Sequence, residues 1–175
     1  LLSNFGNNSL VGYYSALEKL SRAFVGLFSP LTQALYPLSC NKVSHVDGGR
    51  KCISKLLIGI GGLAFVVSLI VVLFSKEIVI LIYNEKFVSY SYILSFLMIW
   101  LFFGVINNIF GIQYLSAKKL DKYYMRAFIF AGLLTLILNV SLIPILMING
   151  LLIGIIVGEI TLTLLMMFFI YRFKL

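Results

Sequence analysis

Long runs of apolar residues recur along the chain, separated by short polar segments. A membrane-spanning helix needs about 20 predominantly apolar residues, because it must cross roughly 30 Å of hydrocarbon with its amide groups bonded internally. Four runs meet this requirement: residues 56–74, 93–113, 127–148 and 150–171. A shorter run, 78–83, cannot span and is expected to lie at the membrane interface. The pattern therefore predicts four spanning helices after residue 55.

A fifth candidate, residues 11–38, is long enough to span but carries charged residues. Its polar positions recur at steps of three and four, which places them on one face of a helix. They are Ser15, Lys19, Arg22, Gly26, Ser29 and Gln33, here called the polar stripe. Pro30 and Pro37 are expected to kink or end the helix, which a membrane bundle tolerates. We therefore predict a fifth spanning helix with one wet face, preceded at residues 1–10 by the tail of an earlier helix and a loop.

The composition agrees with a membrane location. Apolar residues make up 61% of the chain and charged residues 11%, values that exclude a soluble domain of this length as well as intrinsic disorder. The expected fold is all-α: a polytopic membrane helix bundle of about five transmembrane helices. Because the chain begins at Leu1 without a methionine, we expect it to be a fragment of a longer protein.

The net charge of +8 comes from 14 basic and 6 acidic residues, an excess that in a soluble chain would suggest nucleic-acid binding. In a membrane protein it reports orientation instead, because basic residues gather in cytoplasmic loops. With five crossings, one side of the membrane receives Lys42, Arg50, Lys51, Lys55, Lys118, Lys119, Lys122, Arg126, Arg172 and Lys174. The other side receives only Lys76 and Lys86. The sequence therefore predicts a cytoplasmic C-terminus and no nucleic-acid partner.

Charged residues at membrane depth suggest function, because they are costly there unless they face a cavity or a partner. One hypothesis is that Lys19 and Arg22 line a hydrated substrate cavity with Ser15, Ser29 and Gln33 and bind an anionic group such as a phosphate. The structural alternative is that Glu18 pairs with Arg22 while Lys19 extends to the membrane surface. Both readings stay open at this point.

Glu159 lies near the middle of the last span. It could couple transport to a proton or cation, pair with a cation of another helix, or be a satisfied structural carboxyl. On the same helix, Gly150, Gly154 and Gly158 recur at four-residue intervals, a spacing that favours close helix packing. For the amides Asn107, Asn108, Gln113 and Asn139 and for Ser141, hydrogen bonding between helices is the favoured use, with a translocation path as the alternative.

No enzyme motif is found. The chain has no GxSxG, HExxH or Walker lysine, and Cys40, Cys52 and His45 do not form a metal-ligand pattern. We therefore expect no catalytic residues, no metal and no cofactor.

The run VGYYSALEKLSRAFVGLFSPLTQALYP, residues 11–37, resembles a stretch of bacterial polysaccharide and O-antigen flippases in the multidrug/oligosaccharidyl-lipid/polysaccharide exporter superfamily. The matching residues are Gly12, Tyr13, Tyr14, Ser15, Ala16, Glu18, Lys19, Ser29, Pro30, Gln33, Ala34, Tyr36 and Pro37. A weaker similarity covers IVILIYNEKFVSYSYIL, residues 78–94. The resemblance extends over most of the chain in helix order.

This resemblance implies a two-lobe exporter of about twelve spanning helices, of which the chain would form most of the C-terminal lobe. It implies transport of an undecaprenyl-pyrophosphate-linked oligosaccharide from the cytoplasmic to the periplasmic leaflet of the bacterial inner membrane by alternating access. Lys19 and Arg22 would then meet the pyrophosphate or acidic sugars. Expected partners are the lipid-linked substrate and membrane lipids, and association with other polysaccharide assembly proteins is left open.

Three other functions remain, one of which is that of a purely structural membrane subunit, which would not require the polar stripe. A multidrug or cation antiporter of the same superfamily would carry cationic substrates, against which the two cations of the polar stripe argue. A membrane-embedded glycan polymerase should show catalytic residues in an exoplasmic loop, whereas the loops on that side contain only Lys76, Glu77, Glu85 and Lys86 as charged residues.

Overall fold

The computed structural model describes residues 8–43 and 48–172, and these residues form helices joined by short turns, with no strand among them. This architecture confirms the prediction of an all-α helix bundle. The main helices are α2 (Asn8–Val43), α3 (Gly48–Leu56), α4 (Gly62–Leu73), α5 (Ser75–Ile82), α6 (Ser91–Phe110), α7 (Asp121–Leu146) and α8 (Ile148–Arg172). Two π-helical segments, η1 (Leu57–Gly61) and η3 (Gly111–Ser116), and the 3₁₀ segment η2 (Glu85–Tyr90) complete the order.

Four helical segments among the described residues are long and apolar enough to cross a membrane: Lys51–Leu73, Glu85–Ser116, Asp121–Leu146 and Ile148–Arg172. Each contains most of one predicted run, and all four begin earlier than the sequence predicted, the first three by five or more residues. A multi-pass membrane protein follows from these segments. α2 is not among them, so the fifth span stays a prediction.

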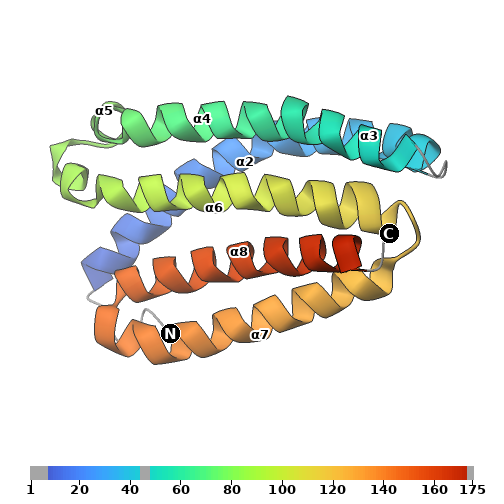
Figure 1. Ribbon diagram of the computed structural model, residues 1–175. Coiled ribbons are helices and arrows are strands. Elements are labelled where there is room, and N and C mark those ends of the chain that lie inside the picture. The colour runs from blue at the N-terminus through green and yellow to red at the C-terminus, as the bar shows by residue number, and fades with distance from the viewer. Residues whose placement is uncertain (1–7, 44–47, 173–175) are drawn as a thin grey trace.

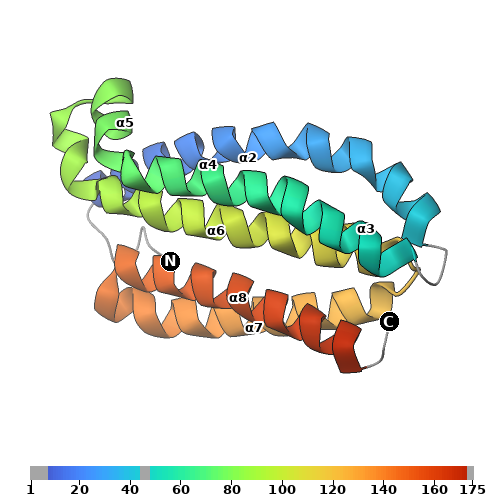
Figure 2. The ribbon, with the colours of Figure 1, turned by 45° about the horizontal axis from the view of Figure 1, so that its top comes forward.

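α2 differs in length from the predicted 11–38. It begins at Asn8, inside the segment expected to be a loop, and continues through Pro30 and Pro37 to Val43. The prolines therefore do not end it, and Figure 2 shows the helix as a long arc. Residues 1–7 lie outside the described part of the chain. The interfacial run 78–83 falls mainly within α5, a short helix beside the end of α4.

α6 lies at the centre of the bundle and contacts α2, α4 and α8 (Figure 1). Its buried residues include Ile93, Leu94, Met98 and Ile109, which form the main core together with residues of α2 and α4 such as Leu17. The outer faces of α4 and α7 carry many exposed apolar side chains, as lipid-facing helices require.

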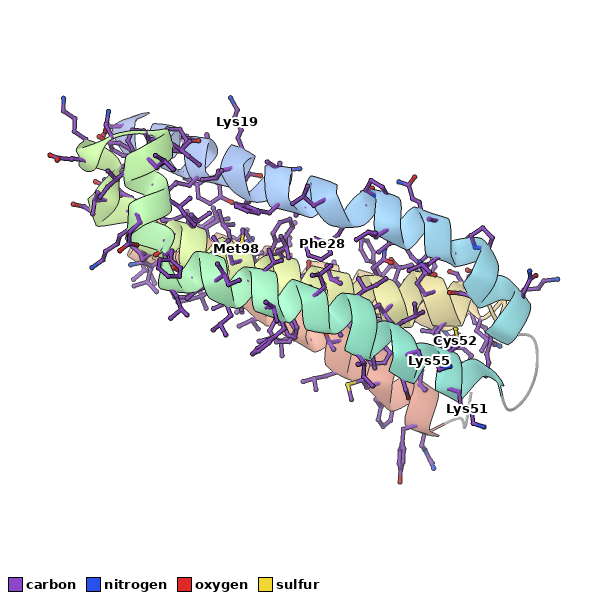
Figure 3. All side chains as sticks on the ribbon, turned by 90° about the horizontal axis from the view of Figure 1, so that it is seen from above. Lys19, Phe28, Lys51, Cys52, Lys55 and Met98 are labelled. Atoms are coloured by element: carbon purple, nitrogen blue, oxygen red, sulfur yellow. The ribbon has the colours of Figure 1, made fainter. Side chains whose placement is uncertain are left out.

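The connecting segments sort the basic residues by end of the bundle. The end of α2, the start of α3, the α6–α7 connection and the end of α8 lie at one end of the bundle, and α5 lies at the other (Figures 1 and 2). Lys51 and Lys55 lie at the end away from α5 in Figure 3. The fold thus brings together the segments that the sequence assigned to the cytoplasmic side.

Candidate functional site

The polar stripe of α2 faces away from the bundle. Lys19, Arg22, Gly26, Ser29 and Gln33 are exposed, and Ser15 is half-buried. Figure 3 shows Lys19 pointing away from the other helices and Phe28 pointing toward them. Because the helix repeats every 3.6 residues, its apolar positions bring the opposite face against the core and leave the stripe outside.

The buried face of α2 contains three hydroxyl residues that bond within the helix. Ser39 donates to the carbonyl of Leu35 at 3.0 Å. Ser21 donates to the carbonyl of Glu18 at 2.8 Å, and Thr32 donates to the carbonyls of Phe28 and Ser29 at 3.1 and 3.0 Å. These bonds satisfy the hydroxyl donors, so this face packs as if it were apolar.

Glu18 and Arg22 form an ion pair one helical turn apart. Arg22 Nη2 and Nε donate to Glu18 Oε1 at 2.7 and 3.1 Å, and the side chains of Arg22 and Glu18 are 67% and 31% exposed. The pairing considered in the sequence analysis is therefore present. An exposed ion pair contributes little in water. Arg22 therefore remains accessible on the exposed face of α2.

The other end of the stripe is also internally bonded. Gln33 Nε2 donates to Ser29 Oγ at 2.9 Å. Along α2 the predicted site residues thus form two adjacent pairs, Glu18 with Arg22 and Ser29 with Gln33.

Two adjoining cavities lie between α2 and α6, next to the Ser29–Gln33 part of the stripe. The first, about 250 Å³, is lined by Val25, Phe28, Ser29, Thr32, Trp100, Leu101, Gly104, Val105 and Asn108. The second, about 270 Å³, is lined by Thr32, Gln33, Tyr36, Asn108, Ile112 and Gln113. Because Thr32 and Asn108 line both, we treat the two cavities as one groove, the α2–α6 groove.

Glu159 on α8 is held by two donors from α6. Asn107 Nδ2 donates to its Oε2 at 2.5 Å, and Trp100 Nε1 donates to its Oε1 at 3.1 Å. Thr163 completes the network by donating to Asn107 Oδ1 at 2.6 Å and to the carbonyl of Glu159 at 2.9 Å. The network joins α6 to α8, and Trp100 connects it to the α2–α6 groove.

Glu159 therefore does not share a site with Glu18: the structure places the two carboxylates on different helices with different partners. The Asn107 bonds between α6 and α8 agree with the favoured use of the buried amides. Trp100 and Thr163 were missed in the sequence analysis, because nothing in their local pattern distinguishes them from packing residues.

The three glycines of α8 face α7. A Cβ atom built on Gly158 would meet Thr135, one built on Gly154 would meet Asn139, and one built on Gly150 would meet the Leu142 backbone. Only glycine permits an approach this close between the two helices.

Within the described ranges, no group of three or more His, Cys, Asp or Glu side chains could hold a metal ion.

Comparison with known proteins finds a similar bacterial protein. No family model matches the chain, and no solved structure matches it. A protein of Escherichia coli (strain K12) named "Putative O-antigen transporter" is 31% identical over 170 residues, which cover 94% of this chain. The chain is similar to this protein along nearly its whole length. The match confirms the resemblance to O-antigen flippases that the motif at residues 11–37 indicated.

The chain spans 40% of the relative's length and therefore corresponds to less than half of that protein. The relative's name describes a transporter, in agreement with the helical membrane architecture of the chain.

Proposed function

We propose that the chain is part of a transporter that moves an undecaprenyl-pyrophosphate-linked O-antigen or polysaccharide repeat unit across the bacterial inner membrane by alternating access. The observation that carries the proposal is the outward-facing polar stripe of α2, which occurs in a bundle whose other long helices expose apolar side chains. A cationic and hydroxyl-bearing face suits a pyrophosphate and a glycan, and lipid would not accept it. The name of the E. coli relative supports the same class of cargo.

In this mechanism the stripe faces a central cavity that a second lobe of the complete protein closes on the other side. Arg22 exchanges Glu18 for the pyrophosphate, and Lys19, one helical turn from Ser15 and exposed, adds a second cation. Rocking of the two lobes then exposes the cavity to one leaflet at a time. The proposed activity is translocation without covalent chemistry.

The first test is substitution of the two cations in the complete protein. Lys19→Ala and Arg22→Ala are each expected to lower surface polysaccharide about tenfold, because each removes a charge-assisted bond to the anionic group. Lys76→Ala, which removes an exposed cation from α5, is the matched control and should leave the polysaccharide unchanged. Immunoblotting with glycan staining measures the product, and membrane fractionation checks insertion. Normal surface glycan in a variant that combines Lys19→Ala with Arg22→Ala would contradict the proposed role of the polar stripe.

The second test concerns orientation. We propose that the α6–α7 connection is cytoplasmic and that η2 is exoplasmic, because the basic residues gather at the first of these ends. Glu85→Cys and Lys122→Cys, both at exposed positions, are introduced separately into the complete protein after Cys40 and Cys52 are replaced by serine. A maleimide that cannot cross membranes should label Glu85→Cys in intact spheroplasts, and Lys122→Cys only after permeabilisation. The reverse pattern would invert the topology.

A further inference from the structure

In the described part of the chain, the α2–α6 groove contains two buried side-chain acceptors that have no hydrogen-bond partner. Gln113 is 1% exposed, and its Oε1 has no hydrogen-bond partner. Asn108 Oδ1 is likewise buried and unpartnered. Both residues line the second cavity of the groove. Buried polar atoms are nearly always bonded, so two orphan acceptors beside one cavity call for a donor from outside the chain.

The geometry of the Gln113 amide is fixed. Its Nε2 donates to the carbonyl of Thr32 on α2 at 2.7 Å, and this bond orients the amide plane. Gln113 also belongs to η3, the π-helical segment that continues α6. Single π-helical turns occur frequently at functional sites, where they redirect a side chain away from the α-helical register. The chain thus holds Oε1 in place without supplying it with a donor.

The walls of the groove indicate the kind of ligand. Val25, Phe28, Leu101 and Ile112 provide apolar surface, and Trp100 adds an aromatic side chain. The lining of both cavities contains neutral polar groups and no charged side chain among the described residues. Such a site suits an uncharged ligand that offers hydroxyl donors and has apolar faces, as a sugar ring does. It suits a cation poorly, because no carboxylate lines it.

We infer that the α2–α6 groove is a saccharide subsite in which Gln113 Oε1 and Asn108 Oδ1 accept hydrogen bonds from sugar hydroxyls. This inference rests on the proposed function and divides the substrate between two places. The anionic group binds at Arg22, and the glycan extends along α2 toward Gln33, about 16 Å further at a rise of 1.5 Å per residue. Each cavity alone falls slightly below the usual range for small-molecule sites, which begins at about 300 Å³, so the joined groove has room for a sugar-sized group.

The experiment measures binding by the purified complete protein in detergent. The probes are undecaprenyl-pyrophosphate-linked N-acetylglucosamine and bare undecaprenyl pyrophosphate. The wild-type protein is expected to bind the sugar-bearing lipid more tightly. Gln113→Leu and Asn108→Leu should each weaken that binding about fivefold, because each removes one neutral hydrogen bond, and should leave binding of the bare lipid unchanged. Arg22→Ala should weaken binding of both probes.

Ser68→Ala is the control, because Ser68 Oγ is also buried and unpartnered but lies on α4, outside the lining of the groove. If Gln113→Leu does not fold, Asn108→Leu tests the subsite instead, because Asn108 is only half-buried and its replacement disturbs the core less. If the groove variants bind both probes as tightly as the wild-type protein does, the saccharide subsite is overturned and the proposed function stands. The same conclusion follows if the wild-type protein binds the two probes with equal affinity. Failure of the wild-type protein to bind either probe would overturn the proposed function, and the subsite with it.

Discussion

Gly158→Leu is expected to separate α7 from α8 and to destabilise the protein by about 3 kcal/mol, because overpacking a close helix contact costs roughly this much. A Cβ atom at this position already meets Thr135 Oγ1 and Cβ, and leucine adds three further carbons at the same place. The apparent melting temperature of the purified protein should fall by roughly 5 to 10 °C. Scanning fluorimetry in detergent would measure the shift.

Two variants separate this packing effect from the general cost of changing a helix glycine. Gly132→Leu introduces the same side chain on α7, where a Cβ meets nothing within 4 Å, and it should change the melting temperature little. Gly158→Ala should cost less than leucine, and Thr135→Ala should restore part of that loss by removing the hydroxyl in its way. Equal melting temperatures for Gly158→Leu and Gly132→Leu would show that the close contact at the α8 glycines does not hold α7 and α8 together.

Glu159→Ala is expected to lower stability by about 2 to 4 kcal/mol. The change removes the acceptors of Asn107 Nδ2 and Trp100 Nε1, and each buried donor left unpaired costs about 1 to 3 kcal/mol. Because the network joins α6 to α8, the loss should appear as easier separation of the α7–α8 pair from the rest of the bundle. Limited proteolysis in the connection around residues 117–120 would detect it together with thermal unfolding.

Glu159→Gln is the informative companion variant. It keeps one oxygen to accept from Asn107 but presents an amide nitrogen to Trp100 Nε1, so it should recover only part of the stability. Ser141→Ala, at an exposed position of α7, serves as the control. If Glu159→Ala melts like the wild-type protein while transport is lost, the carboxylate acts in transport and not as a structural link.

The helical faces followed from the sequence because a single helix obeys a fixed period. The steps of three and four between Ser15 and Gln33 placed these residues on one face, and the structure shows that face turned outward. The same local rule located the four apolar spans, since length and composition alone decide whether a helix can cross a membrane. Helix ends were less predictable: α2 continues past both prolines because a long helix can bend around them.

The partners of Glu159 and Gln113 could not be predicted in this way. Glu159 contacts Asn107 across 52 residues of sequence, and Gln113 contacts Thr32 across 81. A polar residue in an apolar run shows that a partner is needed but not which helix supplies it, because many arrangements of five helices satisfy the same periodicities.

Composition and local period were therefore enough to predict the helical class, the four apolar spans, the grouping of the basic residues and the polar stripe of α2. The packing of the helices was needed to show that the glycines of α8 face α7, that Glu159 bonds to α6, and that a groove with two unsatisfied acceptors lies between α2 and α6. These features depend on which helices are neighbours, and that choice is made by the packing of side chains distant in sequence.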